Sequence, residues 1–251
     1  MKKTMQTLQA GDIFKTNEGG SVTVLKINNT YDVVVRHNDS YKHVTSVTLQ
    51  SLNNGRVKNP YHPTKYGVGY YGVGPYVASV DGNVTKVYQT WTDMLRRCYC
   101  PKHQLDKPTY VRCTVDSRWH NFQVFAKWYI DNPFNNVGYQ LDKDIIYPGN
   151  TVYSPDTCVL VPPLINYQFR DVTNYLNEKG YPPGVKPSRN GMRYLAFHGS
   201  IALGTYDTID QASHAYLRYR RQYLLDIATQ YKDHVDIRVT YTLISTANNL
   251  L

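Results

Sequence analysis

The spacing of apolar residues divides the chain into segments with two different periods. In the N-terminal part, apolar and polar residues alternate over short runs separated by Gly-Gly, Asn-Asn and Asn-Asp pairs, which are typical of tight turns. Farther along, apolar residues recur every three or four positions after Thr90 and again after Ser117, which predicts two amphipathic helices with these residues as candidate N-caps. The alternating runs predict strands at residues 12–15, 21–27, 31–36 and 43–49.

Residues 59–76, between the predicted strands and helices, are rich in Gly, Pro and Tyr. Their G-V-G-Y-Y-G-V-G run lacks the Lys-Ser/Thr ending of a phosphate-binding P-loop. We therefore interpret this stretch as an irregular connection whose glycines allow the backbone to pack closely. A hairpin about Asp81-Gly82 is predicted to follow within residues 76–88.

Residues 139–170 predict a strand, a turn, a second strand and a helix. The strands are expected at 140–146 and 157–161, with a Pro-Gly-Asn turn from Pro148 between them and a helix after Pro163. This order is the outline of a ββα-metal nuclease site. Asp142 and Asp144 alternate along the first strand and are expected on one face, where a hard cation such as Mg²⁺ would offset their repulsion. The alternative is a strand whose solvated acidic residues pair with Lys143.

The C-terminal part predicts three strands followed by one long helix. The strands are expected at 184–187, 192–198 and 201–206, and the helix runs to Tyr231 with Thr208 or Asp210 as its cap. A strand-like run at 237–244 lies in the tail. The expected fold class is α+β, with a small N-terminal β unit (1–58), a central ββα domain with supporting helices (59–171), a linker (172–180), a three-stranded sheet packed on one helix (181–235) and a tail (236–251).

Composition favours a polyanionic partner. Lys and Arg number 28 against 19 Asp and Glu, which gives a formal net charge of +9; an ordinary basic surface is the alternative.

No apolar run reaches the roughly 18 residues of a membrane span, and the N-terminus lacks the apolar core of a secretory signal, so a cytosolic protein without a membrane partner is expected. The thiols are expected to be buried and structural zinc is not expected, because no common zinc template fits the spacing of His103, Cys98, Cys100, Cys113 and Cys158.

A series of motifs between Tyr88 and Arg170 resembles phage-encoded HNH-type endonucleases of the homing type. The matching pieces are W-x-x-M-L-x-R-C-Y from Trp91, W-H-N-F-x-x-F-A-x-W from Trp119, L-D-K-D from Leu141, G-N-x-x-Y-S-P-x-T-C-V from Gly149 and V-P-x-x-I-N from Val161. The resemblance implies a ββα site that hydrolyses phosphodiester bonds in DNA with Mg²⁺ or Mn²⁺. It implies Asp142, Asp144 and Asn166 as metal ligands.

Two positions depart from the HNH pattern. The general-base His expected directly after the first Asp is replaced by Lys143, and the central Asn aligns with Thr157. A Lys at its ordinary pKa is protonated and cannot accept a proton from water, and flanking carboxylates favour that charged form. Lys143 is therefore expected to contact the scissile phosphate. The catalytic set would be Asp142, Lys143 and Asn166, unless the protein only binds DNA.

The C-terminal strands and helix resemble the Apetala-type DNA-binding domain. The matching pieces are L-G-T-Y-D-T from Leu203 and A-x-x-A-Y from Ala212. The resemblance implies that the sheet enters the major groove of double-stranded DNA. It implies contacts from Lys186, Arg189, Arg193 and His198. Leu195 and Phe197 would also face the DNA, which favours phosphate contact over base recognition; a basic surface of a plain α+β module is the alternative.

These observations predict an HNH-like DNA endonuclease of a phage or prophage, acting in the cytoplasm of the bacterial host. The alternative is a catalytically inactive DNA-binding or regulatory protein on the same scaffold, and a third interpretation is an RNA-binding phage factor. Arg96 and Arg97 lie opposite the apolar face of their predicted helix, where they would reach phosphate or remain solvated. The sequence gives no indication of the oligomeric state or the DNA target.

Overall fold

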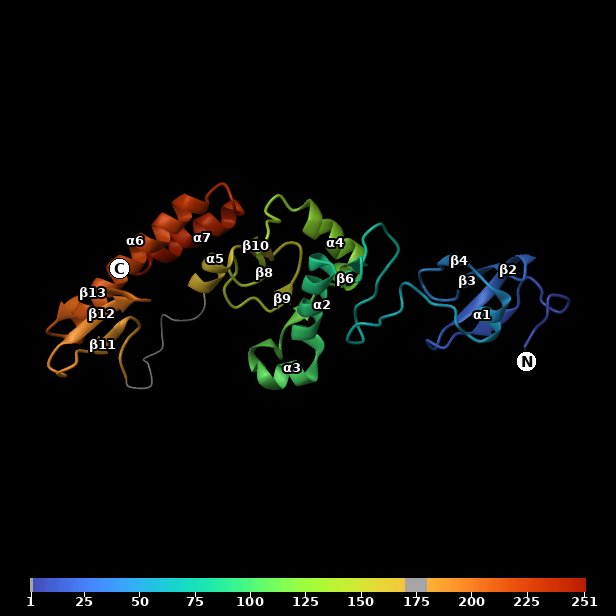
Figure 1. Ribbon diagram of the computed structural model, residues 1–251, viewed down its shortest axis with the longest axis horizontal. Coiled ribbons are helices and arrows are strands. Elements are labelled where there is room, and N and C mark those ends of the chain that lie inside the picture. The colour runs from blue at the N-terminus through green and yellow to red at the C-terminus, as the bar shows by residue number, and fades with distance from the viewer. Residues whose placement is uncertain (1, 170–179) are drawn as a thin grey trace. The chain divides into compact units, whose positions relative to one another are not determined.

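In the computed structural model, which describes residues 2–169 and 180–251, the chain forms seven α-helices and several small sheets within the described ranges (Figure 1). The predicted α+β class is confirmed. The chain divides into two compact units, which are described separately. Unit 1 comprises Met1–Pro108 and Ser117–Lys127, and unit 2 comprises Thr109–Asp116 and Trp128–Leu251. The predicted linker lies, apart from Gly180, outside the described residues.

The N-terminal strands of unit 1 form a four-stranded antiparallel sheet in chain order, close to the predicted positions. Alternate side chains of the two central strands point into a core that is completed by the short helix α1 (Leu49–Asn53). The inward residues Val33 and Val35 are fully buried, and His37 follows them on the same side. The strands are β1 (Ile13–Lys15), β2 (Ser21–Asn29), β3 (Asp32–His37) and β4 (Val44–Val47).

The predicted hairpin about Asp81-Gly82 is present, formed by β5 (Ser79–Val80) and β6 (Asn83–Val84). The helix after it, α2 (Lys86–Tyr99), begins earlier than predicted, because Thr85 rather than Thr90 is its N-cap. The Thr85 side chain accepts a hydrogen bond from the backbone N–H of Tyr88, whereas the Thr90 hydroxyl donates to the Lys86 carbonyl within the helix.

Close packing of the Gly-rich stretch is confirmed. A Cβ atom at Gly69 would lie 2.4 Å from the Leu95 side chain and 2.9 Å from the Trp91 ring. The Trp91 indole donates a hydrogen bond of 2.8 Å to the Trp119 carbonyl. Ser117 does not cap the second predicted helix, because it begins a separate 3₁₀ turn. The remaining short elements of this part of the chain are α3 (Pro101–Asp106), η1 (Pro108–Tyr110), η2 (Ser117–His120) and α4 (Phe122–Asp131).

Unit 2 contains the predicted strand–turn–strand–helix. Strand β8 (Gln140–Asp142) pairs antiparallel with β10 (Val159–Val161), and α5 (Pro163–Gln168) follows directly. The first strand was predicted to reach Ile146 but ends at Asp142. A second pair, β7 (Thr114–Val115) and β9 (Val152–Tyr153), is parallel.

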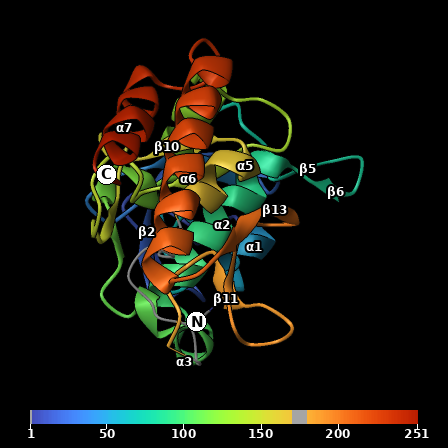
Figure 2. The same ribbon diagram turned by 90° about the vertical axis from the view of Figure 1, so that its left-hand side faces the viewer.

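The C-terminal strands form an antiparallel sheet, β11 (Val185–Pro187), β12 (Tyr194–His198) and β13 (Ile201–Tyr206), with the long helix α6 (Ile209–Tyr231) packed on one face. Thr208 is the N-cap of α6, one of the two predicted caps. The predicted strand at 237–244 is wrong: this segment is helix α7 (Ile237–Asn248), capped by Asp236. Helices α6 and α7 lie side by side (Figure 2).

One apolar core of unit 2 joins the ββα segment to the last two helices. Ile145, Val159 and Ile165 cluster with Leu224 of α6 and Leu243 of α7. The division of the chain therefore differs from the predicted domains, which separated the ββα segment from the C-terminal sheet and helix. Within the described ranges, no helix combines the length and apolarity needed to cross a membrane.

Candidate functional site

The end of strand β8 carries the first residue of the predicted site. Asp142 pairs with Val159 of β10 and is the last residue of β8. One carboxylate oxygen, Oδ1, accepts the backbone N–H groups of Asp144 (2.7 Å) and Ile145 (2.8 Å). This side chain therefore bends the backbone away from the strand and starts the following loop. That turn explains why the predicted strand stops four residues early.

Burial raises the pKa of the Asp142 carboxyl above its usual value, and the nearby charge of Asp144 acts in the same direction. The two backbone N–H groups and Lys143 oppose this rise without cancelling it. Asp142 is thus a half-buried carboxylate held by backbone hydrogen bonds. This arrangement suits a structural role for Oδ1.

Lys143 points into the loop between β8 and β9, which spans residues 143–151. Its side chain is 8% exposed, and the ammonium donates to Asp144 Oδ1 (2.5 Å) and to the Asn150 carbonyl (2.7 Å). It also lies 5.7 Å from the centre of the Tyr153 ring. The ammonium is thus enclosed by Asp144 and Asn150 of its own loop and by Tyr153 of β9, and the expected contact with a scissile phosphate stays a prediction.

Asn150 completes this loop from the other end. Its side-chain amide donates 2.8 Å hydrogen bonds to the carbonyls of Lys143 and Val152. Lys143 and Asn150 therefore bond each other's backbone. Gly149, beside it, has a φ of +80° in the predicted Pro-Gly-Asn turn. The sequence analysis assigned no role to the Asn150 side chain, although its place after Pro-Gly was a usable sign of a turn residue.

The predicted metal ligands do not share one partner. Asp142 holds backbone N–H groups, Asp144 pairs with Lys143, and the Asn166 amide donates to Gln140 Oε1 at 2.7 Å. The described part of the chain has no group of three or more His, Cys, Asp and Glu side chains that could hold a metal ion. The three side chains implied by the resemblance thus hold different partners in this structure, and their role as metal ligands stays a prediction.

Thr157, which takes the place of the expected central Asn, serves the turn before β10. Its hydroxyl lies 2.8 Å from the Ser154 hydroxyl and donates to the Val152 carbonyl. The neighbouring Cys158 is buried, and burial raises the pKa of its thiol. Cys98 and Cys113 are also buried, as predicted, and Cys100 is half-buried.

The C-terminal sheet packs one face against α6, and no helix of the described residues is seen on its other face. The register places Lys186, Leu195 and Thr205 side by side on the outer face. The Lys186 ammonium lies 4.8 Å from the centre of the Phe197 ring, so Phe197 is on that face too. Leu195 and Phe197 thus face outward, as expected.

Arg193 extends this outer face, and Arg189 lies in the adjoining turn. Arg193 donates to the Thr205 carbonyl and forms a 2.7 Å ion pair with Asp207, while its side chain remains 49% exposed. Arg189 is exposed in the turn between β11 and β12. With Lys186, they provide three cationic side chains against one carboxylate.

His198, which was expected to contact DNA, lies on the side of the sheet that packs against α6. Its ring packs against Tyr216, Tyr219 and Tyr223 of α6, with ring centres 4.8–6.1 Å apart. Alternation along β12 turns His198 to the helix side, opposite Leu195 and Phe197. Burial, followed by the charge of Arg220, lowers the pKa of its imidazole.

The two arginines of α2 lie in unit 1. Arg96 is exposed and forms a 3.0 Å ion pair with Asp93, one turn earlier in the helix. Arg97 is half-buried. An exposed pair of this kind contributes little to stability and leaves the Arg96 side chain accessible.

Comparisons with models of protein families, with curated proteins and with solved structures found no match.

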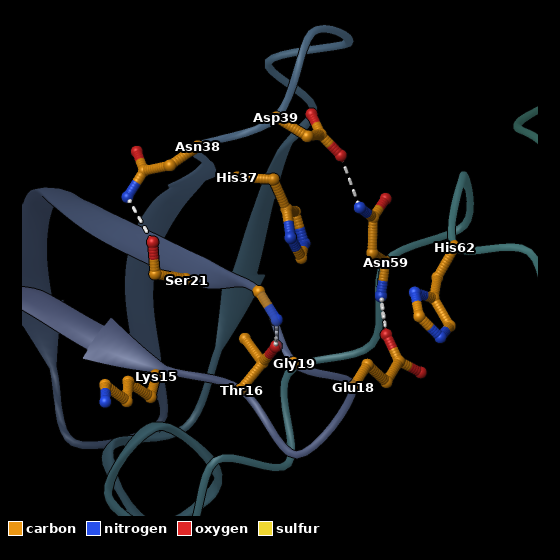
Figure 3. A pocket seen from close by; sticks show the side chains of 11 residues that line it. Lys15, Thr16, Glu18, Gly19, Ser21, His37, Asn38, Asp39, Asn59 and His62 are labelled. Atoms are coloured by element: carbon orange, nitrogen blue, oxygen red, sulfur yellow. Dashed lines mark hydrogen bonds between the residues drawn. The ribbon is translucent and has the colours of Figure 1, made fainter.

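The N-terminal β unit contains a cavity of about 570 Å³ that the sequence pattern did not predict (Figure 3). Its lining includes Glu18, His37, Asp39, Asn59 and His62, from the ends of strands and from the loop after α1. The usable signal was His37, a polar residue that continues the buried alternation of Val33 and Val35.

Proposed function

We propose that the protein binds double-stranded DNA through the outer face of the sheet β11–β12–β13. The observation that carries this proposal is that Lys186 and Arg193 lie on the face opposite α6, with Arg189 exposed in the adjoining turn. Cationic side chains attract the phosphates of DNA, and the net charge of +9 adds a general attraction.

The shape and chemistry of the face support this partner. The major groove of B-DNA admits strands, and side chains of the face would approach its phosphates and base edges. Leu195 and Phe197, between the basic residues, offer apolar contact to thymine methyl groups but no hydrogen bonds to base edges. We therefore propose affinity dominated by phosphate contact, in a phage or prophage protein acting in the host cytoplasm.

Fluorescence anisotropy with a labelled duplex tests the proposal over a range of salt concentrations. The variant Lys186→Gln/Arg189→Gln removes two charges from the sheet face. The matched control Arg218→Gln/Lys232→Gln removes two exposed charges from α6 and its C-terminal end. We expect the sheet variant to bind at least about tenfold more weakly and to reduce the slope of log K against log salt by about two, since each phosphate contact contributes roughly 0.9.

Equal losses in the two variants would contradict a sheet-face interface and indicate attraction to the net charge alone. Matched single-stranded DNA and RNA competitors test the third interpretation. If RNA displaces the duplex more effectively than unlabelled duplex does at the same salt, the partner is RNA.

The second candidate function is DNA cleavage. The observation that favours it is the antiparallel pair β8–β10 followed by α5, with Asp142 at the end of the first strand. It ranks second because Asp142, Asp144 and Asn166 hold three different hydrogen-bond partners in this structure.

Incubation of supercoiled plasmid with Mg²⁺ or Mn²⁺ tests cleavage. Asp142→Asn is the informative variant, because its amide oxygen can still accept the two backbone N–H groups while the charge is lost. Metal-dependent nicking that disappears in Asp142→Asn would support the endonuclease. Duplex binding without cleavage in either metal would leave DNA binding as the function.

A further inference from the structure

The cavity in the N-terminal β unit contains an unusual buried group. His37 is 3% exposed, and its Nε2 atom has no hydrogen-bond partner among the described residues. Figure 3 shows its ring pointing into the space bordered by Thr16, Asn59 and Glu18. A buried polar atom without a partner is costly, so this atom marks a place where a ligand would restore a hydrogen bond.

The unpartnered nitrogen is an acceptor. A hydrogen bond with the Lys58 backbone raises the pKa of His37, so the ring is the donor in this bond. Because Nε2 is not involved, the donor is the other ring nitrogen, Nδ1, which carries the proton. Burial is the largest influence on the ring and lowers its pKa, which keeps the imidazole neutral near pH 7. A neutral imidazole that donates from Nδ1 presents a lone pair on Nε2.

Two carboxylates in the cavity lining add further acceptors. Glu18 Oε2 accepts the Asn59 backbone N–H at 2.9 Å. Asp39 accepts the Asn59 side-chain amide and the backbone N–H groups of Tyr41 and Lys42. Burial alone would raise the pKa of Asp39, but these hydrogen bonds outweigh it and the pKa lies below its usual value. Asp39 is therefore charged at neutral pH.

The lining selects against other ligand chemistries. Lys15 also lines the cavity, but its ammonium points away from His37 and Glu18 (Figure 3). A phosphate would therefore meet the two carboxylates, and an apolar ligand would leave His37 Nε2 without a partner. No described group of three or more His, Cys, Asp and Glu side chains could hold a metal ion. A cation with several N–H donors satisfies both the charge and the acceptors. A guanidinium group has five such donors in one plane and pairs well with carboxylates.

We propose that this cavity binds a guanidinium group, with His37 Nε2 and the carboxylates of Glu18 and Asp39 as its acceptors. The site is separate from the proposed DNA-binding sheet, which lies in the other unit of the chain. The group is either that of a small molecule or that of an arginine side chain presented by a partner protein.

Calorimetric titration of the full-length protein with agmatine tests the proposal. Agmatine carries a guanidinium on a short alkyl chain, and we expect a dissociation constant of about 1 mM or tighter. Butylamine, an ammonium of similar length, should bind more weakly. An acetylated, amidated Gly-Arg-Gly peptide distinguishes the two sources: tighter binding than agmatine indicates an arginine side chain, and weaker binding indicates a small molecule.

Glu18→Gln and His37→Phe should each weaken agmatine binding by at least about tenfold, the effect expected for losing a hydrogen bond to a charged donor. Asp81→Asn, in an exposed turn of the same unit, removes a carboxylate elsewhere and should leave binding unchanged. Glu18 is half-buried and its substitution conserves size, so it tests the site even if His37→Phe disturbs the sheet. Absence of agmatine binding, or equal loss in Asp81→Asn, would overturn the proposal. Binding of deoxyguanosine monophosphate in place of agmatine would also overturn the proposal.

Discussion

At the scale of single residues, one oxygen of Asp142 has the largest effect on the candidate site. It accepts two backbone N–H groups and ends strand β8, so Asp144 no longer follows it on the same face of a strand. The predicted pair of carboxylates assumed an unbroken alternation. Asp competes with strand hydrogen bonds through its own side chain, and here that competition decides the local structure.

Substitutions of Asp142 separate its hydrogen bonds from its charge. Asp142→Ala removes the acceptor of two N–H groups and should lower the free energy of unfolding by about 1–3 kcal/mol. Asp142→Asn retains an acceptor and should cost less. The pKa of Asp142 is raised in the folded protein, so the unfolded chain loses this proton first as the pH rises. The free energy of unfolding therefore falls between the pKa of the unfolded chain, near 3.9, and the higher pKa of the folded protein. The stability of Asp142→Asn relative to wild type should therefore increase over that interval.

Urea denaturation from about pH 4, close to the ordinary pKa of a carboxyl group, to about pH 7 measures both effects. A stability difference between Asp142→Asn and wild type that is the same at every pH would contradict a raised pKa. The same data provide a control for nuclease assays, because Asp142→Ala would lower activity through instability alone.

At the scale of elements, periodicity was sufficient for most segments that bury one face. The N-terminal strands, the C-terminal sheet and helix α6 lie close to their predicted positions. The predicted strand at 237–244 was wrong because its β-branched residues also fit a helix. Val239, Leu243 and Ala247 recur every four residues and are fully buried in α7. Tertiary packing therefore outweighed β-propensity, and this spacing was visible in the sequence.

The start of α2 can be tested because the chain offers two threonines with different roles. Thr85→Ala removes the side chain that accepts the Tyr88 N–H and should lower the free energy of unfolding by about 1 kcal/mol. Thr90→Ala, inside the helix, should change it by less than about 0.5 kcal/mol, because Ala is a better helix former than Thr. Chemical denaturation followed by tryptophan fluorescence measures both, since Trp91 lies in this helix. A larger loss in Thr90→Ala would contradict the observed N-cap.

At the scale of the whole chain, the boundaries between parts were the least predictable feature. Sequence composition suggested that the ββα segment and the C-terminal module are separate. Their packing into one core depends on contacts between residues far apart in the chain, such as Ile165 and Leu243. Buried side chains such as His37 and Arg220 were equally hard to predict, since only the folded chain surrounds them.

Leu243→Ala tests whether this core joins the two segments. Leu243 is fully buried in α7, and the substitution should lower the free energy of unfolding by about 2–5 kcal/mol. If the core is shared, amide hydrogen exchange should accelerate in β10 as well as in α6 and α7. Leu251→Ala, at a residue that is 65% exposed, is the matched control and should change neither. Faster exchange confined to α7 would indicate that the helices do not stabilise the ββα segment.

Helix α6 has a consequence for how this chain tolerates changes in length. Ala212 and Ala215, in its first half, pack under the C-terminal sheet, whereas Leu224 and Ile227, in its second half, belong to the core shared with α5 and α7. An α-helix turns by about 100° per residue. A single inserted or deleted residue between these halves would rotate one set of buried side chains into water. Variation during evolution should therefore be confined there to substitutions or to insertions that restore the helical phase.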